Sequence, residues 1–161
     1  MFDFLNFLQN GYVLAMIGAA LAIALPCIGS AKGVGTVAEA ASGLLAEDPS
    51  KFGKVFLLVA LPSSQAIYGF VTALLIFFNI SPDMITMENG VYEGAYYLMA
   101  ALPIALAGYF SAVRQGRVAA AGVNLVAKRA DQSGKAILNA AMVETFAIFA
   151  LLISLLMVVM K

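Results

Sequence analysis

Several residue types are absent or rare in this chain of 161 residues. It contains no histidine, which argues against a zinc site and against a catalytic site built on histidine. It contains one cysteine, Cys27, so no disulfide can form within the chain, and we interpret Cys27 as a small apolar packing residue. Charged residues make up 11% of the chain and hydrophobic residues 63%, a balance far too apolar for a soluble domain of this length.

The apolar residues are concentrated in four long stretches. Each is long enough to cross about 30 Å of hydrocarbon as a helix. They run over residues 11–30, 54–80, 94–113 and 136–160. None shows the alternation that membrane β-strands need. The Ala-rich, Pro-free segments after the first and third stretches predict that these two helices continue beyond the bilayer. The fold class expected is an all-α membrane protein with four transmembrane helices.

The breaks between these stretches differ in charge. Basic residues gather in or near the first and third breaks, 46–51 and 127–135, whereas the middle break and its flank hold acidic residues and no base. The positive-inside rule places the two basic turns in the cytoplasm. We therefore expect a multi-pass protein of the cell membrane with both termini extracytoplasmic.

The second half of the chain repeats the first. Segment 20–75 aligns without a gap with segment 101–156, and 21 of the 56 aligned positions are identical. We call this correspondence, in which 20 pairs with 101 and 75 with 156, the repeat register. The sequence therefore predicts a tandem duplication of a helical hairpin, with both copies in the same orientation. The first hairpin would span 1–80 and the second 81–161.

The two copies differ at two polar positions. Glu144 of the second hairpin aligns with Ser63 of the first, and Gln115 aligns with Val34. The second hairpin carries a polar pair that the first lacks. We therefore expect the second hairpin to hold an ion-binding site at Glu144 and the first hairpin to hold only a degenerate copy of that site. One ionisable site per chain is expected.

Small residues recur every four positions in the first helix of each hairpin, as at Gly108, Ala112 and Gly116. Such a face lets helix backbones approach closely in lipid. It fits packing inside one four-helix bundle, and it fits equally an inner layer of helices in a ring of many copies.

Glu144 is the only ionisable residue between Ala140 and Met160. A lone ionised carboxylate in mid-membrane costs on the order of 3 kcal/mol, so it needs partners or a proton. Pro62 lacks an N–H and so frees a backbone carbonyl in the turn before it. The other polar residues expected at this depth are Ser63, Ser64, Gln65, Tyr68 and Gln115.

The atoms that this set could offer to an ion are all oxygens, and only Glu144 is charged. Oxygen ligands suit hard cations, and one negative charge is neutralised by a monovalent ion. A proton carrier would need only the carboxylate, so the surplus of neutral oxygens favours Na⁺ over H⁺. The simpler interpretation is that these groups only hydrogen-bond the helices together. An intramembrane carboxylate favours the ion site.

Four segments, in this order, resemble the proteolipid (K or c) subunit of the vacuolar-type rotary ATPases, most closely the bacterial sodium-dependent form. They are GSAKGVG at 29–35, LPSSQAIYGF at 61–70, RQGRVAAAG at 114–122 and AAMVETFAI at 140–148. The resemblance covers nearly the whole chain. It implies that Na⁺ is held by the Leu61 carbonyl, Ser64, Gln65, Tyr68, Gln115 and Glu144. Position 64 is often Thr in that family, and proton-carrying relatives typically lack the glutamines.

The resemblance also implies a function. Identical copies would form a membrane rotor ring in which Glu144 carries Na⁺, or less readily H⁺, past a stator membrane subunit that supplies an Arg. Ion passage would be coupled to ring rotation and so to ATP synthesis or hydrolysis elsewhere. Central-stalk subunits would contact the cytoplasmic turns near 48–50 and 130–132. The chain itself would be a non-catalytic membrane subunit, with lipid and no nucleic acid among its partners.

Two other functions stay open from the sequence alone. A small multidrug or cation exporter also has four helices and one buried glutamate, but that class carries the carboxylate in its first helix and has no tandem repeat. A purely structural, pore-forming ring would not need Glu144 at all.

Overall fold

The structure is a computed structural model that describes residues 10–85 and 88–161, and the described residues form helices and no strand. The first nine residues of the predicted first hairpin lie outside the described part. In chain order the elements are α2 (Gly11–Glu47), η1 (Pro49–Lys51), α3 (Phe52–Ala60), η2 (Leu61–Ser63), α4 (Ser64–Asn79), η3 (Pro82–Ile85), α5 (Gly90–Lys128), η4 (Ala130–Gln132) and α6 (Ser133–Val159).

Four helical spans are long and apolar enough to cross a membrane. They are α2, the run Pro49–Asn79, α5 and the run Ala130–Val159. The prediction of an all-α membrane protein with four transmembrane helices is confirmed. The helices α2 and α5 continue well past the apolar stretches at 11–30 and 94–113, as the Ala-rich segments predicted.

The duplication is visible in the element boundaries. The helix α2 ends at Glu47 and α5 ends at Lys128, which are counterparts in the repeat register, and the turns η1 and η4 that follow are counterparts too. Each hairpin is thus a long helix, a 3₁₀ turn and a returning helix. The predicted division after residue 80 falls between α4 and η3.

One element breaks the symmetry between the hairpins. The returning helix of the first hairpin is interrupted by η2, whereas α6 is continuous. Pro62 in η2 lacks an N–H and crowds the preceding turn, while its counterpart Val143 continues a helix. Just after the interruption, the backbone N–H of Ala66 donates to the Ser30 hydroxyl of α2 at 3.1 Å.

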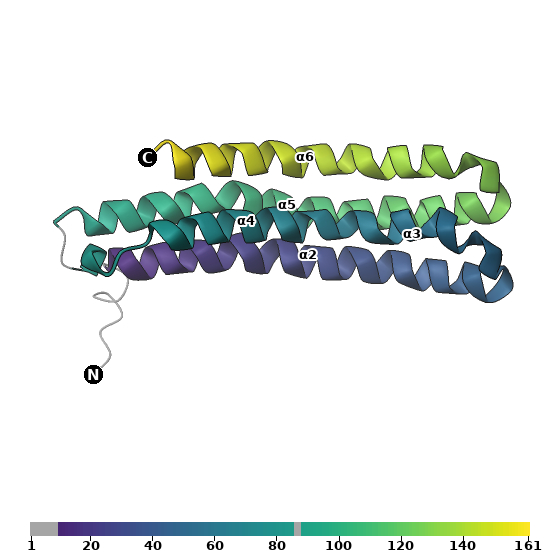
Figure 1. The fold of residues 1–161 in the computed structure, drawn as a ribbon, viewed down its shortest axis with the longest axis horizontal. Coiled ribbons are helices and arrows are strands. Elements are labelled where there is room, and N and C mark those ends of the chain that lie inside the picture. Colours follow the sequence, from purple (N-terminus) through teal and green to yellow (C-terminus); the bar gives the residue numbers. More distant parts are fainter. Residues whose placement is uncertain (1–9, 86–87) are drawn as a thin grey trace.

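The helices α2 and α5 lie side by side and form the main contact between the hairpins (Figure 1). Glycines make the close approach possible. A Cβ built on Gly116 would lie 2.4 Å from the Cα of Gly33, and one on Gly29 would lie 2.7 Å from the Cα of Tyr109. The small-residue face therefore packs the two long helices together inside the chain.

The two hairpin turns lie together at one end of the molecule, and the C-terminal ends of α4 and α6 lie at the other (Figure 1). Lys51 donates to the Ala127 carbonyl at 3.0 Å and so ties the turns to each other. The Ser50 hydroxyl donates to Asp48 at 2.6 Å. This bond, with the nearby Lys51 ammonium, holds the pKa of Asp48 below its ordinary value. Both basic turns therefore share one side of the membrane that the bundle spans.

Two buried apolar clusters form the core. One contains Ile76 and Ile104 and lies toward the C-terminal ends of α4 and α6. The other contains Leu58 and Val123 and lies toward the hairpin turns. The polar residues singled out in the sequence fall between the two clusters along the helices. Apolar packing therefore separates these polar groups from both ends of the bundle.

Candidate functional site

Glu144 lies half-buried on α6, in contact with side chains from two other helices. Its Oε1 accepts a hydrogen bond of 2.5 Å from the Tyr68 hydroxyl of α4. Its Oε2 accepts one of 3.2 Å from Nε2 of Gln115 on α5. Both carboxylate oxygens are thus bound by neutral donors. The ion pairs found within residues 10–85 and 88–161 lie near helix ends and not at this carboxylate.

The two glutamines lie at the centre of the site, and both side chains are fully buried. Gln65 Nε2 donates to Gln115 Oε1 at 2.7 Å, which joins the first hairpin to the second. Gln115 Nε2 also donates to the Ala140 carbonyl of α6 at 3.2 Å. A buried amide without partners costs about 1–3 kcal/mol, so this mutual pairing is what allows two amides in an apolar bundle.

The remaining predicted residues join the same network. The Ser64 hydroxyl donates to the Leu61 carbonyl at 3.0 Å and lies 3.4 Å from Gln65 Oε1, where its contact is weaker. The position of η2, just before α4, brings the Leu61 carbonyl to Ser64. Leu61, Ser64, Gln65, Gln115, Glu144 and Tyr68 therefore form one connected set of polar groups, drawn from three helices of both hairpins.

One residue in this network was missed by the sequence analysis. Ser111 of α5 is buried, accepts a bond of 3.3 Å from Gln65 Nε2 and donates to the Val143 carbonyl at 2.9 Å. It thereby links Gln65 to the backbone beside Glu144. Ser111 lies one helical turn before Gln115, on the same helix face, and this spacing was the available signal.

The counterpart of Glu144 in the first hairpin has a different environment. Ser63 is exposed and donates to the Ala60 carbonyl of its own helix segment at 2.6 Å. Its hydroxyl is satisfied locally and makes none of the contacts between hairpins that Glu144 makes. Within the described residues, the polar network is built once per chain.

The sequence model of the family described as the ATP synthase C subunit matches the chain twice, at residues 17–76 and 98–157. The two matches follow the repeat register, since 17 corresponds to 98 and 76 to 157. The expected duplication is therefore confirmed by the family comparison.

Three characterised relatives are similar to the chain. It is 46% identical over 158 residues, 98% of both chains, to the K subunit of the V-type sodium ATPase of Enterococcus hirae. It is 37% identical over 150 residues to the K subunit of the A-type ATP synthase of Methanocaldococcus jannaschii, covering 91% of this chain and 62% of that one. It is 33% identical over 106 residues to the c′ subunit of the V-type proton ATPase of Candida glabrata, covering 66% and 63%.

Proposed function

The chain belongs to the ATP synthase C subunit family, and we propose that it is the Na⁺-carrying rotor-ring subunit of a V-type ATPase. Members of this family form rings of identical subunits within an ATPase complex and are themselves non-catalytic. The observation that carries the proposal is the network between the two hairpins in which Tyr68 and Gln115 donate to Glu144, and Gln65 donates to Gln115. The sodium ATPase relative supports Na⁺ as the ion.

The donor set suits a small monovalent cation. The Leu61 carbonyl, Ser64 Oγ and Gln65 Oε1 are neighbours separated by 3.0 and 3.4 Å. They supply neutral oxygens, and Glu144 supplies the single negative charge that balances Na⁺. Tyr68 donates its hydroxyl proton to the carboxylate, so we assign it an orienting role in place of the ligand role that the resemblance implies.

Gln115 has to change its orientation to act as a ligand. In this structure its Nε2 faces Glu144, and its Oε1 accepts from Gln65. A half-turn of the terminal amide would present Oε1 to the cation, but it would also turn Nε2 toward Gln65 Nε2, so that two donors would face each other. Na⁺ ligation by Gln115 would therefore break the Gln65–Gln115 hydrogen bond, and the contact between Na⁺ and Oε1 has to stabilise the site by more than that loss.

Neutralisation explains how the site would serve a rotor. With Na⁺ bound, Glu144 carries no net charge and can pass along the lipid, because an uncompensated charge there costs on the order of 3 kcal/mol. The empty carboxylate is tolerated beside a stator Arg, where it releases or takes up the ion. The basic turns at η1 and η4 face the cytoplasm and contact the central stalk, which leaves both termini extracytoplasmic.

Reaction with a hydrophobic carbodiimide tests the ion. This reagent attacks a protonated carboxyl that is reachable from lipid, and exposed Ile148 one turn along α6 indicates that Glu144 lies near such a face. We expect labelling on Glu144, strongest at low pH and suppressed by Na⁺ at fixed pH and ionic strength, since metal and proton compete for one carboxylate. K⁺ should protect far less. Equal protection by Na⁺ and K⁺, or by neither, would show that the sodium assignment is wrong.

The glutamines can be tested in the same assay. Gln65→Leu and Gln115→Leu each remove one ligand to a charged group, worth about 1.5–3 kcal/mol, so half-maximal protection should need about 10- to 150-fold more Na⁺. Asn139→Leu, which changes an exposed amide on α6, is the matched control and should leave the protection unchanged. Normal Na⁺ protection in both glutamine variants would remove them from the site and favour the proton.

A further inference from the structure

The hydroxyl of Ser30 on α2 lies beside the break in the returning helix of the first hairpin. It is buried and accepts the backbone N–H of Ala66 at 3.1 Å. Because α4 begins at Ser64, Ala66 lies in its first turn, whose N–H groups have no partner inside that helix. Within residues 10–85 and 88–161, this is the only side-chain hydrogen bond between α2 and α4. Ser30 therefore supplies, from another helix, a partner for the start of α4.

Close packing holds the two helices together on both sides of this bond. One helical turn before the serine, Pro26 lies against Gly69, since a Cβ built on Gly69 would be 2.8 Å from Cγ of Pro26. One turn after it, Gly33 lies against Pro62, where a Cβ built on the glycine would be 2.8 Å from Cβ of the proline. The hydrogen bond thus lies in the middle of a tight, antiparallel contact between α2 and the returning helix.

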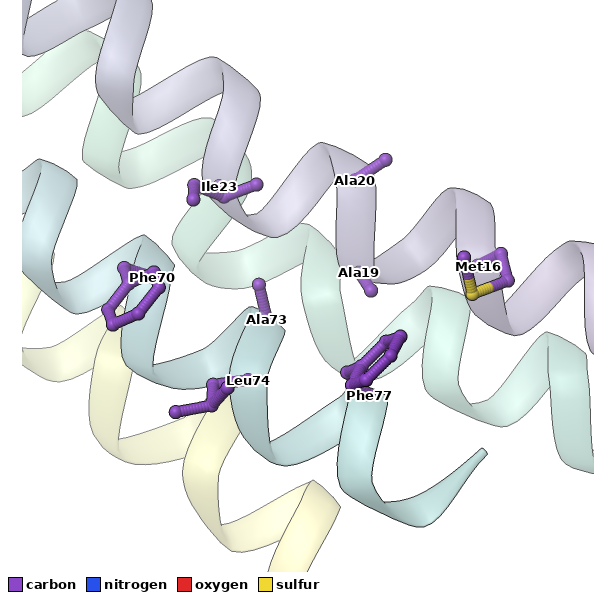
Figure 2. Close-up of a pocket in the computed structure, with 8 residues that line it drawn as sticks. All are labelled: Met16, Ala19, Ala20, Ile23, Phe70, Ala73, Leu74 and Phe77. Atoms are coloured by element: carbon purple, nitrogen blue, oxygen red, sulfur yellow. The ribbon is translucent and has the colours of Figure 1, made fainter. Parts of the chain in front are cut away.

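Beyond this contact, toward the C-terminal end of α4, the packing is more open. An apolar groove of about 280 Å³ lies there between α2 and α4. Figure 2 shows the side chains around it, among them Ile23, Phe70, Ala73 and Phe77. All of the residues that line the groove are apolar, so it offers no hydrogen bond that would hold α4 in place. The position of the start of α4 against α2 therefore depends on the tight contact around Ser30.

The second hairpin shows what this serine does beside an unbroken helix. Ser111 is the counterpart of Ser30 in the repeat register, but its hydroxyl donates to the Val143 carbonyl of α6 at 2.9 Å. Ala147, the counterpart of Ala66, lies in the interior of α6, where backbone N–H groups bond within the helix. The same serine position thus accepts from the backbone where the helix is broken and donates to it where the helix is continuous.

Three of the proposed Na⁺ ligands lie in the five residues before Ala66. They are Leu61, Ser64 and Gln65. The backbone N–H of Ser64 donates to the Leu61 carbonyl, as a 3₁₀ turn requires. In a continuous α-helix, the Leu61 carbonyl would accept from the N–H of Gln65 instead. The geometry of these oxygens therefore depends on the break, and the break ends where Ser30 holds Ala66.

We infer that Ser30 is a positioning residue for Na⁺ binding: it receives the Ala66 N–H and so keeps the turn η2 in the geometry that directs its oxygens to the cation. This inference rests on the proposed function and deepens it, because it gives the long helix of the first hairpin a role at the ion site. Ser30 itself is not a ligand. The alternative is that its hydrogen bond only stabilises the bundle.

Ser30→Cys is the sharpest test, because the thiol fills the same position but is only a weak acceptor. In the purified, full-length protein, half-maximal protection of Glu144 against the carbodiimide should need about two- to tenfold more Na⁺, the effect of losing one neutral hydrogen bond. Ser30→Ala removes the acceptor and should weaken protection at least as much. Ser30→Thr keeps the hydroxyl and should be protected like the unmodified chain.

The pH dependence of labelling without Na⁺ separates positioning from general damage. Tyr68 and Gln115, which donate to Glu144, do not contact Ser30 through any hydrogen bond in the described residues. Labelling of the Ser30 variants in Na⁺-free buffer should therefore follow the same pH profile as that of the unmodified chain. A bundle that has loosened around Glu144 would change both the pH profile and the Na⁺ protection.

Ser154→Ala is the matched control for stability. The Ser154 hydroxyl is also buried and also accepts a backbone N–H from another helix, but it lies ten residues along α6 from Glu144. The variant should lower the melting temperature about as much as Ser30→Ala does. It should leave both the Na⁺ protection and the pH profile unchanged.

The break itself gives a second test. Pro62→Ala restores a backbone N–H and allows α3 and α4 to join, as α6 continues through Val143. The Ala66 N–H would then bond within the helix. Ser30→Ala should therefore lower Na⁺ affinity much less when it is added to the Pro62→Ala chain than when it is added to the unmodified chain. Equal effects in the two chains would contradict a role tied to the break.

The outcomes separate this inference from the proposed function. Weakened Na⁺ protection at an unchanged pH profile, restored by Ser30→Thr, supports the inference. Normal protection in both Ser30→Cys and Ser30→Ala overturns it and leaves Glu144 as the ion site. Weakened protection with a changed pH profile overturns it too, because the loss would then come from the bundle as a whole. An unmodified chain that Na⁺ does not protect overturns the sodium assignment, and this inference with it.

Discussion

At the scale of single residues, the site depends on neutral groups that hold a charged one. Glu144 has a hydroxyl on one oxygen and an amide on the other, and neither partner carries charge. Ionised carboxylates in lipid are costly, and hydrogen bonds to a charged group return about 1.5–3 kcal/mol each. Two such bonds reduce the cost of the ionised carboxylate, and in the proposed rotor the bound Na⁺ or the stator Arg balances its charge.

Ser111 should act on ion binding through Gln65. Ser111→Ala removes the acceptor of one Gln65 N–H, a bond worth about 0.5–1.5 kcal/mol, so Na⁺ affinity should fall about two- to tenfold. Because the effect runs through Gln65, Ser111→Ala should lower Na⁺ affinity less when it is added to the Gln65→Leu chain than when it is added to the wild-type chain. A double-mutant cycle based on Na⁺ protection measures this difference.

Ser154→Ala is the control for this cycle. Ser154 is also buried and accepts a bond between helices, from the Ile104 N–H at 3.2 Å, but it lies about 15 Å from Glu144 along α6. It should change stability without changing Na⁺ affinity. Equal effects of the two serine variants on affinity would mean that Ser111 has only a structural role.

At the scale of elements, the contact between α2 and α5 determines how the site is assembled. Gln65 reaches Gln115 only because the two hairpins approach closely where Gly33 faces Gly116. Glycine is disfavoured in helix interiors by about 1 kcal/mol relative to alanine, so the close packing at each glycine has to stabilise the folded chain by more than that. The sequence spacing of the small residues predicted a packing face, while the partner of each glycine became clear only from the packed helices.

Gly116→Ala should separate the hairpins. The added Cβ would meet the Gly33 backbone, which cannot move aside, so the helices must shift at a cost of about 1–3 kcal/mol, partly offset by better helix propensity. We expect a lower melting temperature together with weaker Na⁺ protection. Gly43→Ala, also within a long helix but with nothing within 4 Å of the new Cβ, should be neutral or slightly stabilising. A Gly116→Ala chain as stable as Gly43→Ala would contradict the close contact.

At the scale of the whole molecule, the duplication produces two hairpins with one site. The returning helix of the first hairpin is broken at Pro62 and supplies neutral groups, while the continuous α6 supplies the charge. Copies of a symmetric hairpin would place a carboxylate at every contact. Because Ser63 stands where the second hairpin has Glu144, the number of carboxylates is halved, and in the proposed ring each copy would carry one ion per passage.

Ser63→Ala and Glu144→Gln test this division in the complete ATPase. Ser63 is exposed and bonded to its own helix segment, so its loss should change ATP-driven Na⁺ uptake into membrane vesicles very little, in line with surface changes of about 0.5 kcal/mol or less. Glu144→Gln should abolish uptake, because the neutral amide neither balances Na⁺ nor binds a proton reversibly. Similar losses in both variants would contradict the repeat register. Continued uptake in Glu144→Gln would indicate a pore.

The sequence by itself determined the four spans, the register of the repeat and the identity of the polar groups at one depth. These features depend on composition and local spacing: apolar length sets a membrane span, and depth along a helix follows from residue count. For that reason Gln65, Tyr68, Gln115 and Glu144 could be predicted to lie at one level before any contact was known.

Only the tertiary structure decided which of these groups touch and which surfaces stay open. The place of Ser111 between Gln65 and the α6 backbone, the orientation of the Gln115 amide and the open groove of the first hairpin all depend on how helices rotate and approach. Counterparts in the two hairpins have the same local spacing, yet Ala20 is exposed and Ala101 is buried. The difference comes from what packs against each copy, a non-local property that the periodicity of the sequence does not encode.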